Sequence, residues 1–206
     1  MKRILLVFMI VLSISFISGC KFTNQDKSKI PPTVNVTDYA PLTKGSYWEY
    51  EGNGNEYASF NRRVLFTQGN LAQISEDNGG TVISKIIEGT NDVVKLVYFE
   101  AESYQPSNML ETGFVANSEA IIIKSPLQVG TNWTDKDGKK EIVALDSIVD
   151  TPLGKIDNCL KLKITNPDDT IYQYYKKGIG LVKQEFISGD TIITSTIKKY
   201  QVEPSK

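Results

Sequence analysis

Carboxylates and tyrosines are the side chains through which this 206-residue chain could do chemistry, because it contains no histidine. Histidine is the commonest general base and the commonest metal ligand in proteins. A Ser–His or Cys–His nucleophile is therefore excluded, and the sequence also lacks a nucleophile elbow, a P-loop and a dinucleotide fingerprint. Paired carboxylates remain an acid–base possibility, because their separation in space does not follow from their spacing in sequence.

Two pairs of aspartates, Asp168 with Asp169 and Asp135 with Asp137, offer oxygen atoms of the kind that calcium binds. Neither pair has the spacing of a calcium loop, and turn chemistry accounts for both. We therefore expect no metal ion and no cofactor. The net charge of −1, without a long basic block, also argues against nucleic acid as a partner.

One motif occurs twice and organises the rest of the chain. Pro41-Leu42-x-x-Gly45-x-x-Trp48 returns 85 residues later as Pro126-Leu127-x-x-Gly130-x-x-Trp133. A weaker match at an offset of 89 residues relates Thr81, Gly89 and Val93 to Thr170, Gly178 and Val182. Internal repeats of this kind define an architecture before any local assignment. We predict two related β units, residues 38–124 and 125–206, that form one continuous domain.

Strand and turn signals alternate over almost the whole chain after residue 40. β-Branched and aromatic residues dominate the segments, Gly, Asn and Asp cluster between them, and helical periodicity is nearly absent. The prediction is an all-β, antiparallel fold of about twelve strands, with a strongly curved or barrel-like sheet that hides its edges. Residues 103–117 are the exception, and we expect a long loop there, with a short helical turn and a position that could make it a lid.

Aromatic faces can stack on sugars and on apolar ligands. Trp48 and Trp133 hold equivalent places in the two units, which favours a role as structural anchors, because each unit must bury its own face first. Tyr172, Tyr174 and Tyr175 form the candidate ligand-binding set, with ordinary strand packing as the alternative.

The first residues form an export signal. Lys2 and Arg3 precede an apolar run, residues 4–16, that is too short to span a membrane and ends in Ile17-Ser18-Gly19-Cys20. This ending resembles the lipobox of bacterial lipoproteins. The resemblance implies that residues 1–19 are removed and that Cys20 carries a diacylglycerol, with a palmitate-type acyl chain, that anchors the protein to the lipid bilayer.

Residues 20–37 comprise the lipidated cysteine and a polar tether, which would hold the domain about 20–25 Å from the bilayer. The expected location is the extracellular face of the cell membrane. Cys159 is then the one remaining cysteine, so no internal disulfide forms. Strict alternation places it opposite Leu160 and Leu162, on the face of Lys161, and a structural role is favoured over a reactive one.

Three segments together resemble a family of exported lipoproteins from Gram-positive, clostridia- or bacillus-like bacteria. They are the Pro-Leu-x-x-Gly-x-x-Trp motif of residues 126–133, Thr-Pro-x-Gly-x-x-x-Asn-Cys-Leu-Lys at residues 151–161, and Tyr-Tyr-x-x-Gly-x-Gly-Leu-Val-Lys at residues 174–183. The resemblance brings no activity and no catalytic residues. In architecture alone, the expected sheet is similar to the curved half-barrels that carry lipoproteins or lipids.

The function that these patterns favour is non-enzymatic. A membrane-anchored β domain would bind an envelope ligand or protein partner, with an amphiphile as one candidate. The alternatives are a carboxylate-dependent enzyme that acts on cell-wall polysaccharide, which needs two carboxylates in an aromatic cleft, and a purely structural envelope protein, which would expose an apolar patch without a pocket.

Overall fold

The computed structural model describes residues 34–204. The signal segment 1–19, Cys20 and the tether up to residue 33 lie outside the described residues, so export and lipidation stay predictions. The chain from Val34 onward is one structural unit with its own hydrophobic core. A unit of this kind has what a domain needs in order to fold by itself.

Twelve strands and two short helical turns make up the secondary structure of residues 34–204. Their bounds are η1 (Val36–Tyr39), β1 (Tyr47–Asn53), β2 (Phe60–Gln68), β3 (Leu71–Asp77), β4 (Val82–Gly89), β5 (Val93–Glu100), α1 (Met109–Thr112), β6 (Ala120–Lys124), β7 (Asn132–Asp135), β8 (Gly138–Thr151), β9 (Gly154–Thr165), β10 (Thr170–Lys176), β11 (Gly180–Ser188) and β12 (Thr191–Gln201).

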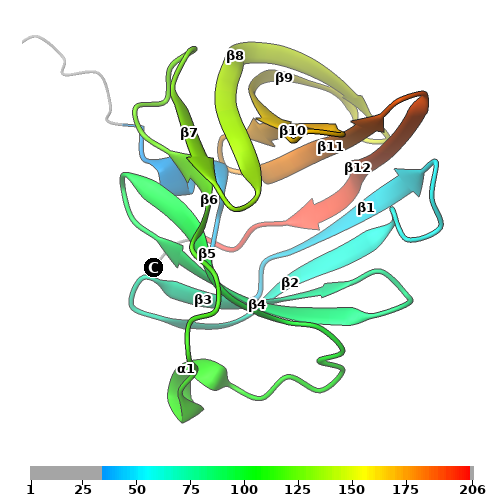
Figure 1. Cartoon of the computed structure of the whole chain (residues 1–206). Coiled ribbons are helices and arrows are strands. Elements are labelled where there is room, and N and C mark those ends of the chain that lie inside the picture. Colours follow the sequence, from blue (N-terminus) through cyan, green and yellow to red (C-terminus); the bar gives the residue numbers. More distant parts are fainter. Residues whose placement is uncertain (1–33, 205–206) are drawn as a thin grey trace, which may run out of the picture. The chain divides into compact units, whose positions relative to one another are not determined.

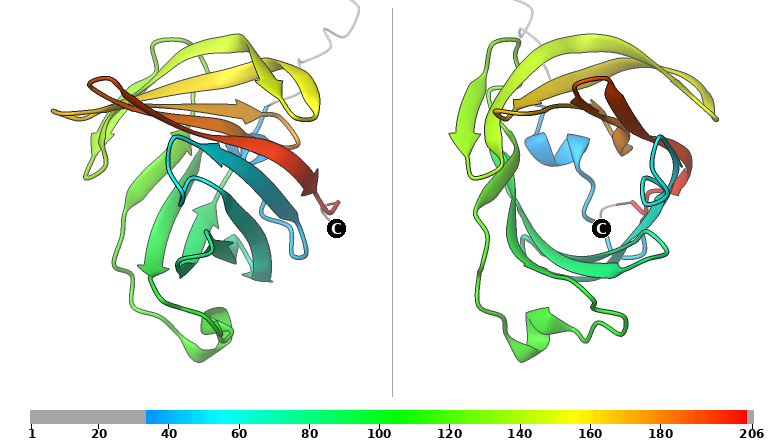
Figure 2. Two further views of the ribbon diagram at one scale, coloured as in Figure 1. Left: turned by 90° about the vertical axis from the view of Figure 1, so that its right-hand side faces the viewer. Right: turned by 45° about the vertical axis from the view of Figure 1, so that its right-hand side comes forward.

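The strands form one antiparallel sheet in the order β6-β5-β4-β3-β2-β1-β12-β11-β10-β9-β8-β7. Each strand pairs with its neighbours in sequence except that β6 and β7 do not pair with each other, and β1 pairs in addition with β12. The sheet is thus two six-stranded meanders, β1–β6 and β7–β12, joined where β1 meets β12. It curves round on itself into a nearly closed, barrel-like form (Figures 1 and 2). The predicted all-β, antiparallel, strongly curved fold is confirmed.

The two Pro-Leu-x-x-Gly-x-x-Trp motifs lead into the first strand of each meander and make matching backbone hydrogen bonds. Gly45 N–H donates to Val64 O at 3.0 Å, and Gly130 N–H donates to Ile142 O at 2.9 Å. In each motif the next N–H donates to the carbonyl three residues earlier, from Ser46 to Thr43 O and from Thr131 to Gln128 O, both at 3.1 Å. Both glycines have positive φ, 92° and 90°, which residues with a Cβ seldom adopt. The two motifs therefore have the same local structure, while the duplication of the whole unit stays a prediction.

β6 and β7 are the outer strands of the sheet order, and side chains connect them. The main chain of Ile121 in β6 is bonded on both sides: its N–H donates to Asp135 Oδ2 at 2.8 Å, and its carbonyl accepts from Lys140 Nζ at 2.7 Å and from Trp133 Nε1 at 3.3 Å. We call this junction between β6 and β7 the seam. It closes the barrel through side chains of β7 and β8 in place of a strand ladder.

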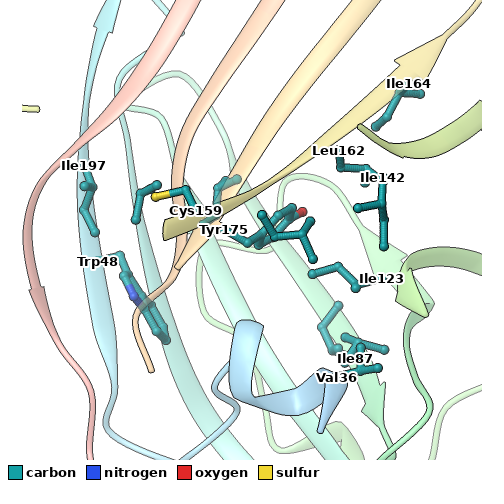
Figure 3. Close-up of a cluster of buried hydrophobic side chains, with 14 of the residues drawn as sticks. Val36, Trp48, Ile87, Ile123, Ile142, Cys159, Leu162, Ile164, Tyr175 and Ile197 are labelled. Atoms are coloured by element: carbon teal, nitrogen blue, oxygen red, sulfur yellow. The ribbon is translucent and has the colours of Figure 1, made fainter. Parts of the chain in front are cut away.

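The η1 turn plugs one end of the barrel. Val36 N–H donates to Asn91 O in the β4–β5 turn at 3.0 Å, and Asp38 O accepts from Gly178 N–H in the β10–β11 turn at 2.7 Å. Val36 is fully buried and lies beside Ile87 (Figure 3). Because the two turns belong to different meanders, the plug ties both of them together at the end where the described chain begins.

The predicted long loop between β5 and β6 contains a single helical turn, α1, and packs outside the barrel (Figure 1). The buried side chain of Gln73 holds it there: its Oε1 accepts from Met109 N–H at 2.9 Å, and its Nε2 donates to Ser107 O at 2.8 Å. No residue of the loop lines the interior cavity that is described below. Among the described residues, no helix has the length and apolar character required to cross a membrane.

Candidate functional site

The interior of the barrel holds a cavity of about 710 Å³. Much of its wall is apolar and comes from both meanders; examples are Leu42, Ile87, Val94, Leu96, Ile122 and Ile171. The lining runs from Leu42, just after the plug, to Asn55 and Tyr57 in the β1–β2 turn at the opposite end. Since the latter two residues are exposed, the cavity reaches solvent at the end away from the plug.

Three charged side chains of the first meander lie inside this mainly apolar cavity, which Lys140 and Asp137 at the seam also line. Arg62 on β2, Glu76 on β3 and Lys85 on β4 come from adjacent strands and all line the cavity. We call them the charged triad. Arg62 is paired directly with Glu76 in the β2–β3 ladder, and Lys85 lies opposite Ile74, two residues from Glu76. The sheet register therefore places both cations against one carboxylate.

The contacts within the triad are close. Arg62 Nε donates to Glu76 Oε1 at 2.8 Å, Arg62 Nη2 lies 2.7 Å from the same oxygen, and Lys85 Nζ is paired with Glu76 Oε2. The side chains of Arg62 and Lys85 are 24% exposed and that of Glu76 is 14% exposed. The triad thus carries a net charge of +1 in a place that is largely shielded from bulk water.

Electrostatics keep Glu76 and Arg62 ionised. Burial by itself would raise the pKa of Glu76, but the charges of Lys85 and Arg62 outweigh it and lower the pKa to about 2. Burial would lower the pKa of Arg62, and Glu76 reverses the effect, so that the pKa lies above its usual range. A carboxyl group that stays ionised at neutral pH does not have the raised pKa that a general acid requires.

Aromatic rings hold the Arg62 guanidinium in place. Tyr50 and Phe60 stack with ring centroids 4.3 Å apart, and the guanidinium carbon lies 5.9 Å and 5.7 Å from the two centroids. Tyr50 Oη donates to Leu181 O at 2.8 Å. The orientation of Arg62 is therefore set by contacts on both meanders before any ligand arrives.

A neutral polar cluster lines the wall in the second meander. Gln173 Nε2 donates to Gln184 Oε1 at 2.7 Å, and Tyr175 Oη donates to Gln173 Oε1 at 2.8 Å. Burial raises the pKa of Tyr175, so its hydroxyl stays protonated. The cavity therefore has one charged wall and one neutral polar wall between apolar surfaces.

The three tyrosines predicted to bind a ligand are divided by the sheet. Tyr175 is buried and lines the cavity. Tyr172 and Tyr174 have the opposite strand parity, and Lys161 Nζ lies over their rings at 4.2 Å and 5.1 Å. Tyr174 also donates to Glu185 Oε2 at 3.0 Å. The structure thus brings one member of the predicted set to the cavity and pairs the other two with charged side chains on β9 and β11.

The two tryptophans are buried, with exposures of 3% and 6%. Trp48 Nε1 donates to Ile179 O at 2.6 Å, while Trp133 contacts the seam as described above. Each is paired across its first hairpin with a cation, Trp48 with Arg62 and Trp133 with Lys140. Both indoles thus occupy core positions, as the assignment as structural anchors requires.

The two aspartate pairs have different surroundings. Asp169 lies in the β9–β10 turn, where its Oδ1 accepts from Asn166 Nδ2 at 2.8 Å. Asp135 and Asp137 lie 3.0 Å and 3.7 Å from Lys140 Nζ at the seam. Within residues 34–204, no group of three or more His, Cys, Asp or Glu side chains is placed to hold a metal ion.

Cys159 is fully buried and belongs to the hydrophobic core. The preceding residue, Asn158, has φ of +48°, and the thiol lies 3.5 Å from Ile156 O. The irregular backbone therefore buries a residue that strict alternation placed with Lys161. Burial raises the pKa of the thiol to about 11, so the reactive thiolate is scarce at neutral pH.

Sequence reasoning missed the charged triad. A signal for it was present: in each of the three strands the charged residue shares its parity with apolar residues, as in Phe60-x-Arg62-x-Val64 and Ile83-x-Lys85-x-Ile87. A charge at such a position is directed toward the interior, where it requires a partner.

No protein-family model matches the chain, and no curated protein matches it. Two solved structures are similar at a low level. One, described as an exported protein with a YmcC-like fold from Bacteroides fragilis, has a TM-score of 0.46 and 13% identity over 78% of this chain and 97% of that chain. The other, described as a lipoprotein from Parabacteroides distasonis, has a TM-score of 0.45 and 14% identity over the same shares. At these TM-scores the likeness supports no inference about ligand or activity.

Proposed function

We propose that this chain is an exported, lipid-anchored envelope protein whose β domain binds an amphiphilic ligand inside the barrel. The observation that carries the proposal is the cavity of about 710 Å³ with an open end, apolar walls and a charged triad. Small-molecule sites typically measure about 300–1,000 Å³ and combine apolar walls with a few placed polar groups. An apolar cavity that is filled only by water forgoes the favourable burial that an apolar ligand would supply.

Binding is favoured over catalysis by the state of the carboxylate in the cavity. Glu76 is engaged by two cations and stays ionised, so it cannot supply the proton that glycoside cleavage needs. The same ionised group is compatible with a fixed electrostatic role in a binding site. We therefore assign the triad to ligand recognition.

The anchor comes from the N-terminal sequence. Cys20 follows the lipobox-like segment, and the mainly polar residues 21–35 separate it from the plug. The plug closes the barrel at the end where the described chain begins, and the cavity reaches solvent at the other end. Such a domain would present its open end away from its attachment. Incorporation of labelled palmitate by the wild-type chain, and its loss in Cys20→Ser, would test the anchor separately from the domain.

Native mass spectrometry tests the ligand. Residues 21–206, which contain the described β domain, are incubated with a bacterial lipid extract, freed of excess lipid and sprayed under native conditions. We expect a protein that carries one amphiphile. The double variant Leu96→Phe/Ile171→Phe narrows the cavity and should lose it, while Tyr172→Ala, outside the cavity, should keep it. An empty wild-type protein, or equal occupancy in the narrowed variant, would refute binding inside the barrel.

A further inference from the structure

We infer that the ligand has an anionic head group, a carboxylate or a phosphate, that docks on Arg62 and Lys85 with its apolar chain directed toward the plug. This inference rests on the proposed function and specifies the chemistry of its ligand. Four observations support it: the net charge of the triad, its unpaired hydrogen-bond donors, its fixed geometry and its position between the open end and the plug.

The charged side chains that line the cavity form two groups. Arg62, Lys85 and Glu76 sum to +1, whereas Lys140 and Asp137 at the seam sum to zero. Asp135 also pairs with Lys140 from outside the lining and brings the seam group to −1. An anion in the cavity is therefore attracted to the triad and repelled from the seam. A cationic head would be repelled at the triad, and a neutral head would gain no charge-assisted hydrogen bond there.

The triad has hydrogen-bond donors to spare. A guanidinium has five N–H donors and an ammonium has three. Within residues 34–204, the hydrogen bonds and ion pairs of Arg62 and Lys85 go to Glu76 alone, so Arg62 Nη1 and part of the Lys85 ammonium have no partner in the protein, and both side chains line the cavity. Thr81 Oγ1, in the same lining, is buried without a hydrogen-bond partner in the structure. An oxyanion at the triad would pair with the donors of Arg62 and Lys85 that the protein leaves unpaired.

The geometry of Arg62 is set in advance. Glu76 binds the Nε and Nη2 edge of the guanidinium, and the rings of Tyr50 and Phe60 lie beside the guanidinium. A planar guanidinium that is already held in place binds carboxylate or phosphate with little further loss of side-chain freedom. The free edge of this guanidinium is thus a prepared anion site.

The sheet register defines where an apolar chain would go. Along β4, Lys85 is followed inward by Ile87, whose buried side chain contacts the plug region with Val36 (Figure 3). Val94 and Leu42 line the same deep part of the cavity. The charges lie nearer the open end and the apolar wall continues beyond them to the plug. An amphiphile would therefore enter tail first and leave its head on the triad.

Isothermal titration with four twelve-carbon probes tests the head group. Dodecanoate, dodecyl phosphate, 1-dodecanol and dodecyltrimethylammonium are titrated into residues 21–206 below their micelle concentrations. We expect at least one anionic probe to bind about tenfold or more tightly than dodecanol, which corresponds to one charge-assisted hydrogen bond, and the cationic probe to bind most weakly. Carboxylate and phosphate are distinguished by the ratio of the first two affinities.

Variants of the triad make the test specific. Lys85→Met should lower the affinity for the anionic probes to that for dodecanol, while Glu76 still neutralises Arg62. Glu76→Gln should strengthen anion binding, because it removes the competing negative charge. Lys161→Met, next to Tyr172 and Tyr174, is the matched control and should change nothing. Circular dichroism confirms that each variant is folded before it is titrated.

The outcomes distinguish the anionic head group from the proposed binding function. Equal binding of dodecanol and both anionic probes, or unchanged anion binding by Lys85→Met, would overturn the anionic head group and leave the proposed function standing. Binding of none of the four probes would overturn both.

Discussion

The two junctions between the meanders are built in different ways. Where β1 meets β12, seven residue pairs from Tyr47↔Gln201 to Asn53↔Thr194 form an antiparallel ladder with one register shift. Where β6 meets β7, three side chains converge on the main chain of a single residue, Ile121. One junction is thus held by backbone hydrogen bonds and the other by a tryptophan and a buried ion pair.

This difference has consequences for stability. A backbone ladder depends weakly on the identity of its side chains, since the bonds come from the peptide groups. The seam depends on Asp135, Lys140 and Trp133, and the pair within it is nearly inaccessible, with exposures of 11% and 4% for the first two. Regions with few backbone bonds across them open at lower free energy than ladders do. We therefore expect the loss of an ion-pair partner to cost more at the seam than at the ladder.

The largest effect is expected from Asp135→Ala. It leaves the Lys140 ammonium buried with only the longer contact to Asp137, and it leaves Ile121 N–H without an acceptor. Removal of one partner of a buried pair typically costs about 3–5 kcal/mol. Urea unfolding at pH 7 measures the loss. The double variant Asp135→Leu/Lys140→Met should recover most of it, and a loss below about 1 kcal/mol for the single variant would show that the seam does not depend on this pair.

A smaller effect is expected from low pH. Burial would raise the pKa of Asp135, but hydrogen bonds from Lys140 and from the amides of Asp137 and Ile121 lower it, and the pKa of Glu76 is about 2. A carboxylate whose pKa is lower in the folded state than in the unfolded state stabilises the fold at pH values above its unfolded-state pKa. This stabilisation is lost as the pH falls through the folded-state pKa. Stability should therefore decline from about pH 4.5 toward about pH 2. The urea midpoint of Asp135→Asn should fall less between these pH values than the midpoint of the wild type. Equal falls in the two proteins would contradict the role of Asp135.

The two tryptophans permit a direct comparison of the junctions. Trp48→Phe removes the 2.6 Å bond to Ile179 O, and an unpaired buried polar group costs about 1–3 kcal/mol. Trp133→Phe also removes a hydrogen bond, from Trp133 Nε1 to Ile121 O. The loss of this bond should lower the free energy of unfolding less, because Ile121 O keeps the 2.7 Å bond from Lys140. The single tryptophan left in each variant then reports one junction, and acrylamide should quench Trp133 more strongly than Trp48. The reverse order would mean that the ladder is the looser junction.

The smallest effect is expected at the ladder. Glu49 on β1 and Lys199 on β12 form a pair at 3.3 Å, but their side chains are 29% and 59% exposed. Exposed pairs typically contribute about 0–1 kcal/mol, since water screens them and the long side chains lose freedom. Glu49→Gln should therefore shift the urea midpoint little. A loss as large as that of Asp135→Ala would remove the contrast between the two junctions.

The strands were largely predictable from the sequence because their signals are local. Gly and Asn at the hairpin turns, with alternation between them, mark strands such as β3 (Leu71–Asp77) and β12 (Thr191–Gln201). β7 is harder to predict, because four residues between a turn and a hairpin carry too little alternation. Its place in the sheet comes from tertiary contacts of Trp133 and Lys140.

The candidate site was less predictable, for a physical reason. Arg62, Glu76 and Lys85 are 14 and 9 residues apart in sequence, and their proximity follows from the registers of three strands and the bulge in the β2–β3 pair, between Val64 and Phe66. Turn residues indicate that a hairpin exists but do not define which residues face each other across it. Likewise, the separation of Tyr175 from Tyr172 and Tyr174 follows from strand parity only once the inner face of β10 is known.

The most direct test of the central claim is a crystal structure of residues 21–206 with 12-bromododecanoate. Binding of an amphiphile inside the barrel predicts an anomalous bromine peak in the deep part of the cavity, near Ile87 and Val94, with the carboxylate on Arg62 and Lys85. A peak confined to the outer surface of the sheet, or an interior without the probe, would contradict it.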